Sequence, residues 1–71
     1  PQQVEYVQKR LRELGYYEVG EIDSEFGPRS RDALNAFKAD NRLPLVSSLS
    51  VDENITDKAV VALYGAKPRE I

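Results

Sequence analysis

The apolar residues near the start of the chain recur at the spacing of an α-helix. They are Val4, Val7, Leu11 and Leu14. Steps of three and four residues place side chains on one face of a helix, so the segment predicts an amphipathic helix, with Gln8 among the polar residues outside its apolar stripe. Gly15 follows the stripe, at the position where a left-handed residue commonly ends a helix. We therefore predict a first helix over residues 4–14.

Two further helices follow from start and stop signals. Gly27-Pro28 predicts the start of the second helix, because a proline is favoured in the first turn, where its missing N–H is no loss. Asn41 can end this helix, and Pro44 prevents it from continuing. Its inward stripe is expected to be Ala33, Leu34 and Phe37, and its outward residues Arg29, Arg31, Asp32 and Lys38. The third helix is predicted from residue 54 or 56 to residue 64, with Gly65 as its stop.

The remaining segments predict connectors, a tail and a core. Residues 44–51, PLVSSLSV, favour an extended connector that can contain a short strand. Residues 66–71 are predicted to form a frayed tail or linker. Ile22 and Phe26 are expected to anchor the corner between the first two helices, and Tyr16 to pack back on the first helix. The expected core consists of Val7, Leu11, Leu14, Leu34, Phe37, Val60 and Leu63.

Composition excludes several classes of protein. The chain has no Cys and no His, so it predicts no disulfide, no thiolate or imidazole metal site and no cofactor. Its formal net charge of −2 speaks against nucleic-acid binding, which needs clustered positive charge. The longest apolar run, residues 59–66, is far below the roughly 20 residues that span a bilayer, so no membrane insertion is expected. Because the chain begins with Pro1, we expect an excised domain or a processed product.

Three stretches carry a resemblance to a known family. They read Val4-x-x-Val7-Gln8-x-x-Leu11-x-x-Leu14-Gly15-Tyr16-Tyr17, Gly20-x-Ile22-Asp23-x-x-Phe26-Gly27 and Ser30-x-x-Ala33-Leu34-x-x-Phe37. Over residues 4–63 the chain resembles the small bacterial peptidoglycan-binding domain that is often appended to cell-wall hydrolases. The resemblance implies an all-α fold, a compact three-helix bundle with long loops. It also implies a single domain over residues 1–71, with its core at about residues 4–65.

The same resemblance implies a function and a location. The domain would be a non-catalytic module that binds the glycan strand or the stem peptide of peptidoglycan and targets an attached or partner enzyme to this polymer. Such a module works outside the cytoplasm, in the periplasm, the cell wall or the medium. We expect it to be a monomer.

Several positions depart from the usual pattern of that family. Ser24 stands where glycine is preferred, a position that can require a positive φ. Ser30 replaces threonine and Lys38 replaces glutamine. The connector over residues 43–52 is longer than usual.

The candidate ligand-binding residues are Tyr17, Asp23, Arg29, Ser30 and Arg31. Tyr17 offers an aromatic ring for a sugar or peptide face. Asp23 is either a ligand contact or a carboxylate that organises the turn, and Ser30 either a contact or a brace of the second helix. Arg29 and Arg31 either form a solvated helix face or pair with stem-peptide carboxylates.

The residues also bear on three alternative functions. Catalysis is not expected, because the carboxylates available for acid–base chemistry cluster on a short exposed connector in a chain with little room for a cleft. A three-helix DNA reader is disfavoured by the acidic residues in the turn between the first two helices. A protein–protein interaction domain that kept the fold and lost glycan binding remains an alternative, favoured by Ser24 and the longer connectors.

Overall fold

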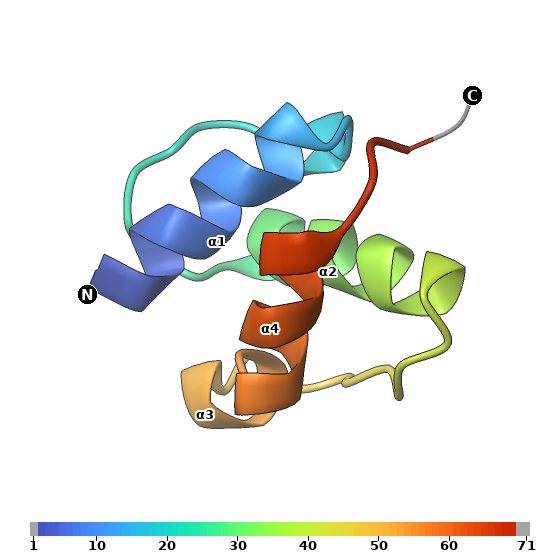
Figure 1. Cartoon of the computed structure of the whole chain (residues 1–71). Coiled ribbons are helices and arrows are strands. Elements are labelled where there is room, and N and C mark those ends of the chain that lie inside the picture. Colours follow the sequence, from blue (N-terminus) through green and yellow to red (C-terminus); the bar gives the residue numbers. More distant parts are fainter. Residues whose placement is uncertain (1, 70–71) are drawn as a thin grey trace.

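The computed structural model describes residues 2–69, and every regular element within that range is a helix or a 3-10 turn (Figure 1). The elements are α1 (Gln2–Glu13), the 3-10 turn η1 (Tyr17–Val19), α2 (Pro28–Asp40), α3 (Val51–Asn54) and α4 (Asp57–Gly65). The predicted all-α fold and its three main helices are confirmed. The short elements η1 and α3 were not predicted. Within this range no helix has the length and apolar character that crossing a membrane requires.

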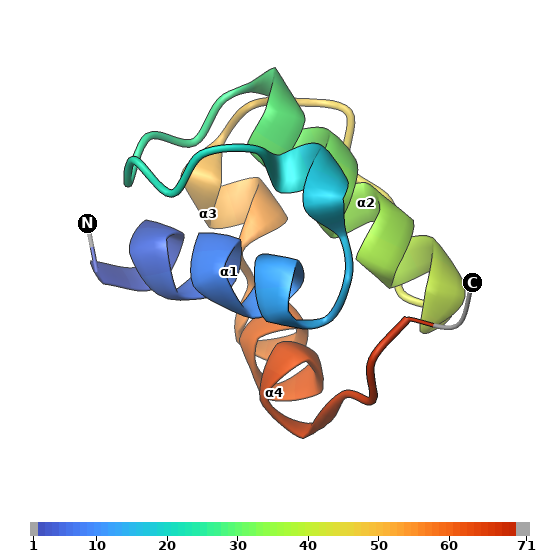
Figure 2. The ribbon, with the colours of Figure 1, turned by 90° about the horizontal axis from the view of Figure 1, so that it is seen from above.

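The three longer helices cross one another around a common interior. Helix α1 contacts α2 and η1, and it also contacts α4. The turn η1 follows α1 directly and packs against α2, so it lies between the two helices (Figure 2). The long connector from η1 to α2 then passes beside the N-terminal half of α1 (Figures 1 and 2). This connector forms the corner that carries most of the predicted site residues.

The predicted core is confirmed with two changes. Six of the seven expected residues are buried, whereas Val60 is only partly buried against the core. Tyr16 is 2% exposed and packs its ring edge-on against Phe37, with 5.7 Å between the ring centroids. Phe26 packs partly buried against the core, but Ile22 lies outside it, and Val19 of η1 occupies the interior instead. The corner is therefore anchored by its 3-10 turn more than by its extended part.

Two polar side chains that were predicted to face outward are buried. Gln8 is 1% exposed and Lys38 is 3% exposed. Gln8 is covered by the corner connector, to which it donates and from which it accepts hydrogen bonds. Lys38 donates from Nζ to the main-chain carbonyl of Asn54, at the end of α3, over 2.7 Å. In both cases a segment distant in sequence covers the side chain, which helical periodicity alone does not reveal.

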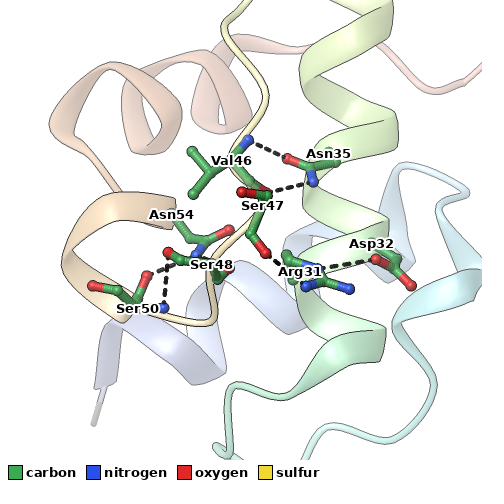
Figure 3. A network of polar contacts seen from close by, with 8 residues as sticks. All are labelled: Arg31, Asp32, Asn35, Val46, Ser47, Ser48, Ser50 and Asn54. Atoms are coloured by element: carbon green, nitrogen blue, oxygen red, sulfur yellow. Dashed lines mark hydrogen bonds and ion pairs between the residues drawn. The ribbon is translucent and has the colours of Figure 1, made fainter.

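The connector between α2 and α3 is ordered without a strand (Figure 3). The side chain of Asn35 donates to the carbonyl of Val46 over 2.8 Å and accepts from its N–H over 3.1 Å. The Asn54 amide donates to the carbonyls of Ser48 and Ser50 over 2.9 and 2.7 Å. These side chains satisfy main-chain groups that a neighbouring strand would otherwise pair.

The described part of the predicted frayed tail, residues 66–69, is docked rather than frayed. The main-chain N–H of Arg69 donates to the carbonyl of Leu14 over 2.7 Å. The Arg69 guanidinium lies 4.3 Å from the centre of the Tyr16 ring and pairs with both carboxylate oxygens of Glu18, over 2.8 and 2.9 Å. Arginine is suited to this position because its planar fork both stacks on rings and grips carboxylates. Residues 70–71 lie outside the described residues.

Candidate functional site

A shallow hollow lies at the corner between η1 and α2. We call it the corner depression, and its volume is about 440 Å³. It is lined by Val19, Glu21, Asp23, Glu25, Phe26, Gly27, Pro28, Arg29 and Ser30. Three predicted site residues, Asp23, Arg29 and Ser30, are therefore brought together, whereas Tyr17 and Arg31 are not part of the lining.

The amide of Gln8 holds the corner against α1. Its Nε2 donates to Asp23 Oδ1 over 3.1 Å, to the Glu25 carbonyl over 3.0 Å and to Ser30 Oγ over 3.0 Å. Its Oε1 accepts from the N–H of Ser24 over 2.9 Å. Because an amide nitrogen carries two hydrogens, those hydrogens are shared among three acceptors. One buried side chain thus fixes the whole turn that leads into α2.

Sequence reasoning missed this role of Gln8, although a signal was present. Val4, Gln8 and Leu11 recur at steps of four and three residues, which places Gln8 on the inward face of α1. A buried amide is tolerated only where its groups find partners, and the corner supplies them.

The structure confirms the positive φ that was expected at position 24. The φ of Ser24 is 61°, in the left-handed region that residues other than glycine adopt with strain. The conformation turns the N–H of Ser24 toward Oε1 of Gln8. The hydrogen bond to Gln8 offsets part of the cost of a side chain at this position.

Asp23 combines a turn-forming role with an exposed carboxylate. Oδ1 accepts from the N–H of Glu25 over 3.0 Å as well as from Gln8. The Glu25 N–H first, and the Gln8 amide second, hold the pKa of the Asp23 carboxyl below its usual range. Asp23 is therefore suited to accept hydrogen bonds from hydroxyl or amide groups and poorly suited to donate a proton.

Ser30 and Arg29 take opposite positions in the first turn of α2. Ser30 is 3% exposed, and its hydroxyl braces the helix against Gln8 rather than capping it. Arg29 is exposed, and its guanidinium lies across Gly20. A Cβ on Gly20, whose φ is 71°, would stand 2.6 Å from Nη1 of Arg29, so this close approach depends on glycine.

Tyr17 is an exposed aromatic residue three positions before the same glycine. Its side chain is 68% exposed, whereas that of Tyr16 is 2% exposed, so the predicted division between the two tyrosines is confirmed. Tyr17 begins η1, and its carbonyl accepts from the N–H of Gly20 over 3.2 Å. Gly20 thus contacts the main chain of Tyr17 in η1 and the side chain of Arg29 in α2.

Arg31 is directed away from the corner depression. Its Nε donates to the carboxylate of Asp32 over 3.1 Å, and its Nη1 donates to the carbonyl of Ser47 over 2.8 Å (Figure 3). Arg31 therefore holds the connector between α2 and α3 in addition to any contact with a ligand.

The corner depression is open and carries charged residues around a partly apolar lining. Its rim carries the exposed residues Glu21, Asp23, Glu25 and Arg29. Such a surface offers hydrogen-bond acceptors and one planar donor group to a polar polymer.

Comparison with protein-family models matches residues 1–47 to the family described as "Putative peptidoglycan binding domain". The matched segment includes α1, η1 and α2, and with them every residue of the corner depression. Comparison with curated proteins gave no match, and neither did comparison with solved structures. The match extends over more than half of the 71 residues. The chain therefore belongs to the peptidoglycan-binding domain family.

Proposed function

We propose that this domain binds peptidoglycan at the corner depression and the neighbouring Tyr17, without catalysing a reaction. In this proposal it holds an attached or partner enzyme on the polymer, in the periplasm, the cell wall or the medium. The observation that carries the proposal is the convergence of Asp23, Arg29 and Ser30 in one hollow within the segment that matches the family.

Each site residue has a role that fits its surroundings. Tyr17, exposed at the start of η1, stacks on a sugar ring or a peptide face. Asp23 accepts hydrogen bonds from sugar hydroxyl or peptide N–H groups, and Arg29 pairs with a stem-peptide carboxylate. Ser30 forms the floor, whereas Arg31 bonds the connector between α2 and α3 and could contact the polymer only beyond the corner depression.

An open site of this kind binds a single unit of the polymer weakly. An affinity between millimolar and micromolar corresponds to about 4–8 kcal/mol of binding free energy. A repeating polymer compensates for this, because a released domain remains close to further sites at high effective concentration.

Co-sedimentation with purified sacculi tests the proposal. We expect the domain to sediment with sacculi, and Tyr17→Ala and Arg29→Ala each to weaken binding by about 1 kcal/mol. The effect of Arg29→Ala should be larger at low salt, because exposed charges are screened least there. Tyr64→Ala is the matched control: Tyr64 is also exposed, at 80%, but lies on α4 outside the corner depression.

Amide NMR shifts on adding soluble muropeptides provide the second readout. Shifts should cluster at Tyr17, Gly20 and Arg29. If the wild-type chain neither sediments nor shows these shifts, the proposal is wrong. The domain should also release no reducing sugar or free peptide from sacculi, and a release that scales with its concentration would overturn the non-catalytic part.

A protein-interaction domain is the second candidate. Val61 and Tyr64 are 71% and 80% exposed and lie three residues apart on α4, so they share one face of that helix. The protein-interaction function takes precedence if the domain fails to bind sacculi. Pull-down of the attached or partner enzyme by the isolated domain would support it.

A further inference from the structure

A second concavity lies where the end of α2, the following connector and the start of α4 meet. We call it the α4 groove, and its volume is about 420 Å³. Its lining consists of Lys38, Leu43, Pro44, Val46, Glu53, Thr56, Asp57, Lys58 and Ala59. It shares no lining residue with the corner depression.

The α4 groove contains a buried positive charge that has little compensation. Lys38 is 3% exposed and donates to one acceptor, the carbonyl of Asn54, although an ammonium carries three donors. Among residues 2–69 no carboxylate forms an ion pair with it. Burial lowers the pKa of this ammonium, because the charged form is kept away from water.

The first turn of α4 adds donors to the same groove. The Thr56 hydroxyl accepts from the N–H of Ala59 over 3.2 Å. The first hydrogen bond of the helix runs from Val60 to the carbonyl of Thr56, over 3.0 Å. The N–H groups of Asp57 and Lys58 therefore have no acceptor within the helix, and the helix dipole favours negative charge beside them.

The other charged residues of the groove do not cancel Lys38. Glu53, Asp57 and Lys58 are all exposed, so water and salt screen their fields. The charge of Lys38 is screened far less because it is buried. The remaining wall, formed by Leu43, Pro44 and Val46, is apolar.

We propose that the α4 groove binds the carboxyl terminus of a peptide that ends in an apolar residue, a function beyond the proposed binding of peptidoglycan at the corner depression. The terminal carboxylate pairs with Lys38 Nζ and the free N–H groups at the start of α4. The apolar side chain packs against Leu43, Pro44 and Val46.

The α4 groove is built from two parts of the sequence. Lys38 and the apolar wall lie within the segment that matches the family, whereas Glu53 and the first turn of α4 lie beyond it, because the family match ends at residue 47.

The test is an amide NMR titration of the 71-residue chain with N-acetyl-Ala-Leu, which has a free carboxylate, and with its carboxamide. The carboxylate peptide should shift the amides of Val46, Lys58 and Ala59. The carboxamide should bind about tenfold more weakly, since it lacks the charge-assisted hydrogen bonds. Equal binding of the two peptides, or shifts that avoid these residues, would overturn the proposal without the need for any variant.

Two variants locate the charge that matters. Lys38→Gln removes the positive charge but keeps a long polar side chain, and it should remove the preference for the carboxylate. Lys58→Gln removes an exposed cation from the same groove and should retain most of that preference. A retained preference in a folded Lys38→Gln domain would contradict the assignment.

A third variant separates this proposal from peptidoglycan binding. Arg29→Ala should leave the peptide titration unchanged, because Arg29 lines only the corner depression. Failure of sacculus binding and failure of peptide binding are therefore distinguishable. Loss of peptide binding in Arg29→Ala would refute a separate α4 groove.

Discussion

Replacing Gln8 with leucine should remove most of the stability of this domain. Leucine has a similar size and suits a helix, so the substitution changes mainly the hydrogen bonds. It deletes the three donations from Nε2 and the one acceptance by Oε1. The groups left behind belong to Asp23, Ser24, Glu25 and Ser30.

The magnitude follows from how well those four groups regain water. A typical hydrogen bond contributes about 1 kcal/mol net, and a buried group left without a partner costs about 1–3 kcal/mol. Asp23 and Glu25 are exposed and can be rehydrated, whereas Ser30 is 3% exposed and cannot. We expect a loss of about 2–4 kcal/mol. A domain of this size rarely has more than about 3–5 kcal/mol in total.

Urea denaturation followed by far-ultraviolet circular dichroism measures the effect. Lys9→Leu is the matched control on the neighbouring exposed position of α1, and it should change the unfolding free energy by less than about 0.5 kcal/mol. Ser30→Ala removes one acceptor and should cost about 1 kcal/mol. It should cost less in the Gln8→Leu background, where its partner is already absent, if that background retains a folding transition.

If Gln8→Leu unfolds within about 0.5 kcal/mol of the parent, the amide does not hold the corner. If Ser30→Ala costs the same in both backgrounds, the two side chains are not coupled.

Four further predictions concern the core, the strained turn and the docked tail. Phe37→Ala should cost about 3–5 kcal/mol and abolish the thermal transition, and a variant that melts close to the parent would contradict the core assignment. Ser24→Gly should raise the unfolding free energy by about 1 kcal/mol in urea, because glycine relieves the positive φ. Burial and then the hydrogen bond to Asp40 raise the pKa of Tyr16 to about 12. The contribution of the neutral Tyr16 hydroxyl to stability is therefore complete below the unfolded-state pKa and is lost as the pH rises toward 12. Tyr16→Phe should remove a late step from the ultraviolet titration of tyrosine. Arg69 lowers the pKa of Glu18. The stability from this pair is therefore present above the unfolded-state pKa of Glu18 and is lost as the pH falls through the folded-state pKa. Arg69→Ala should reduce that loss of stability in acid denaturation.

The sequence by itself determined the local elements of this protein. Apolar spacing and the flanking Gly15, Pro28 and Gly65 were sufficient to predict three helices, because periodicity and helix termini depend on neighbouring residues. The family pattern also marked Ser24 as a position of positive φ, which its φ of 61° confirms. Local sequence also predicted that Tyr16 packs on the first helix whereas Tyr17 stays exposed, because Tyr16 directly follows Gly15.

Only the tertiary structure decided which polar side chains are buried and what they hold. Gln8 meets the corner connector and the first turn of α2 15 to 22 residues later, and Lys38 meets Asn54 after 16 residues. Arg69 reaches Glu18 across 51 residues and turns the predicted frayed tail into a docked segment. The helix propensity of a polar residue is the same whether its side chain faces water or a buried partner. The choice depends on which distant segment covers it, and that follows from the packing of the whole chain.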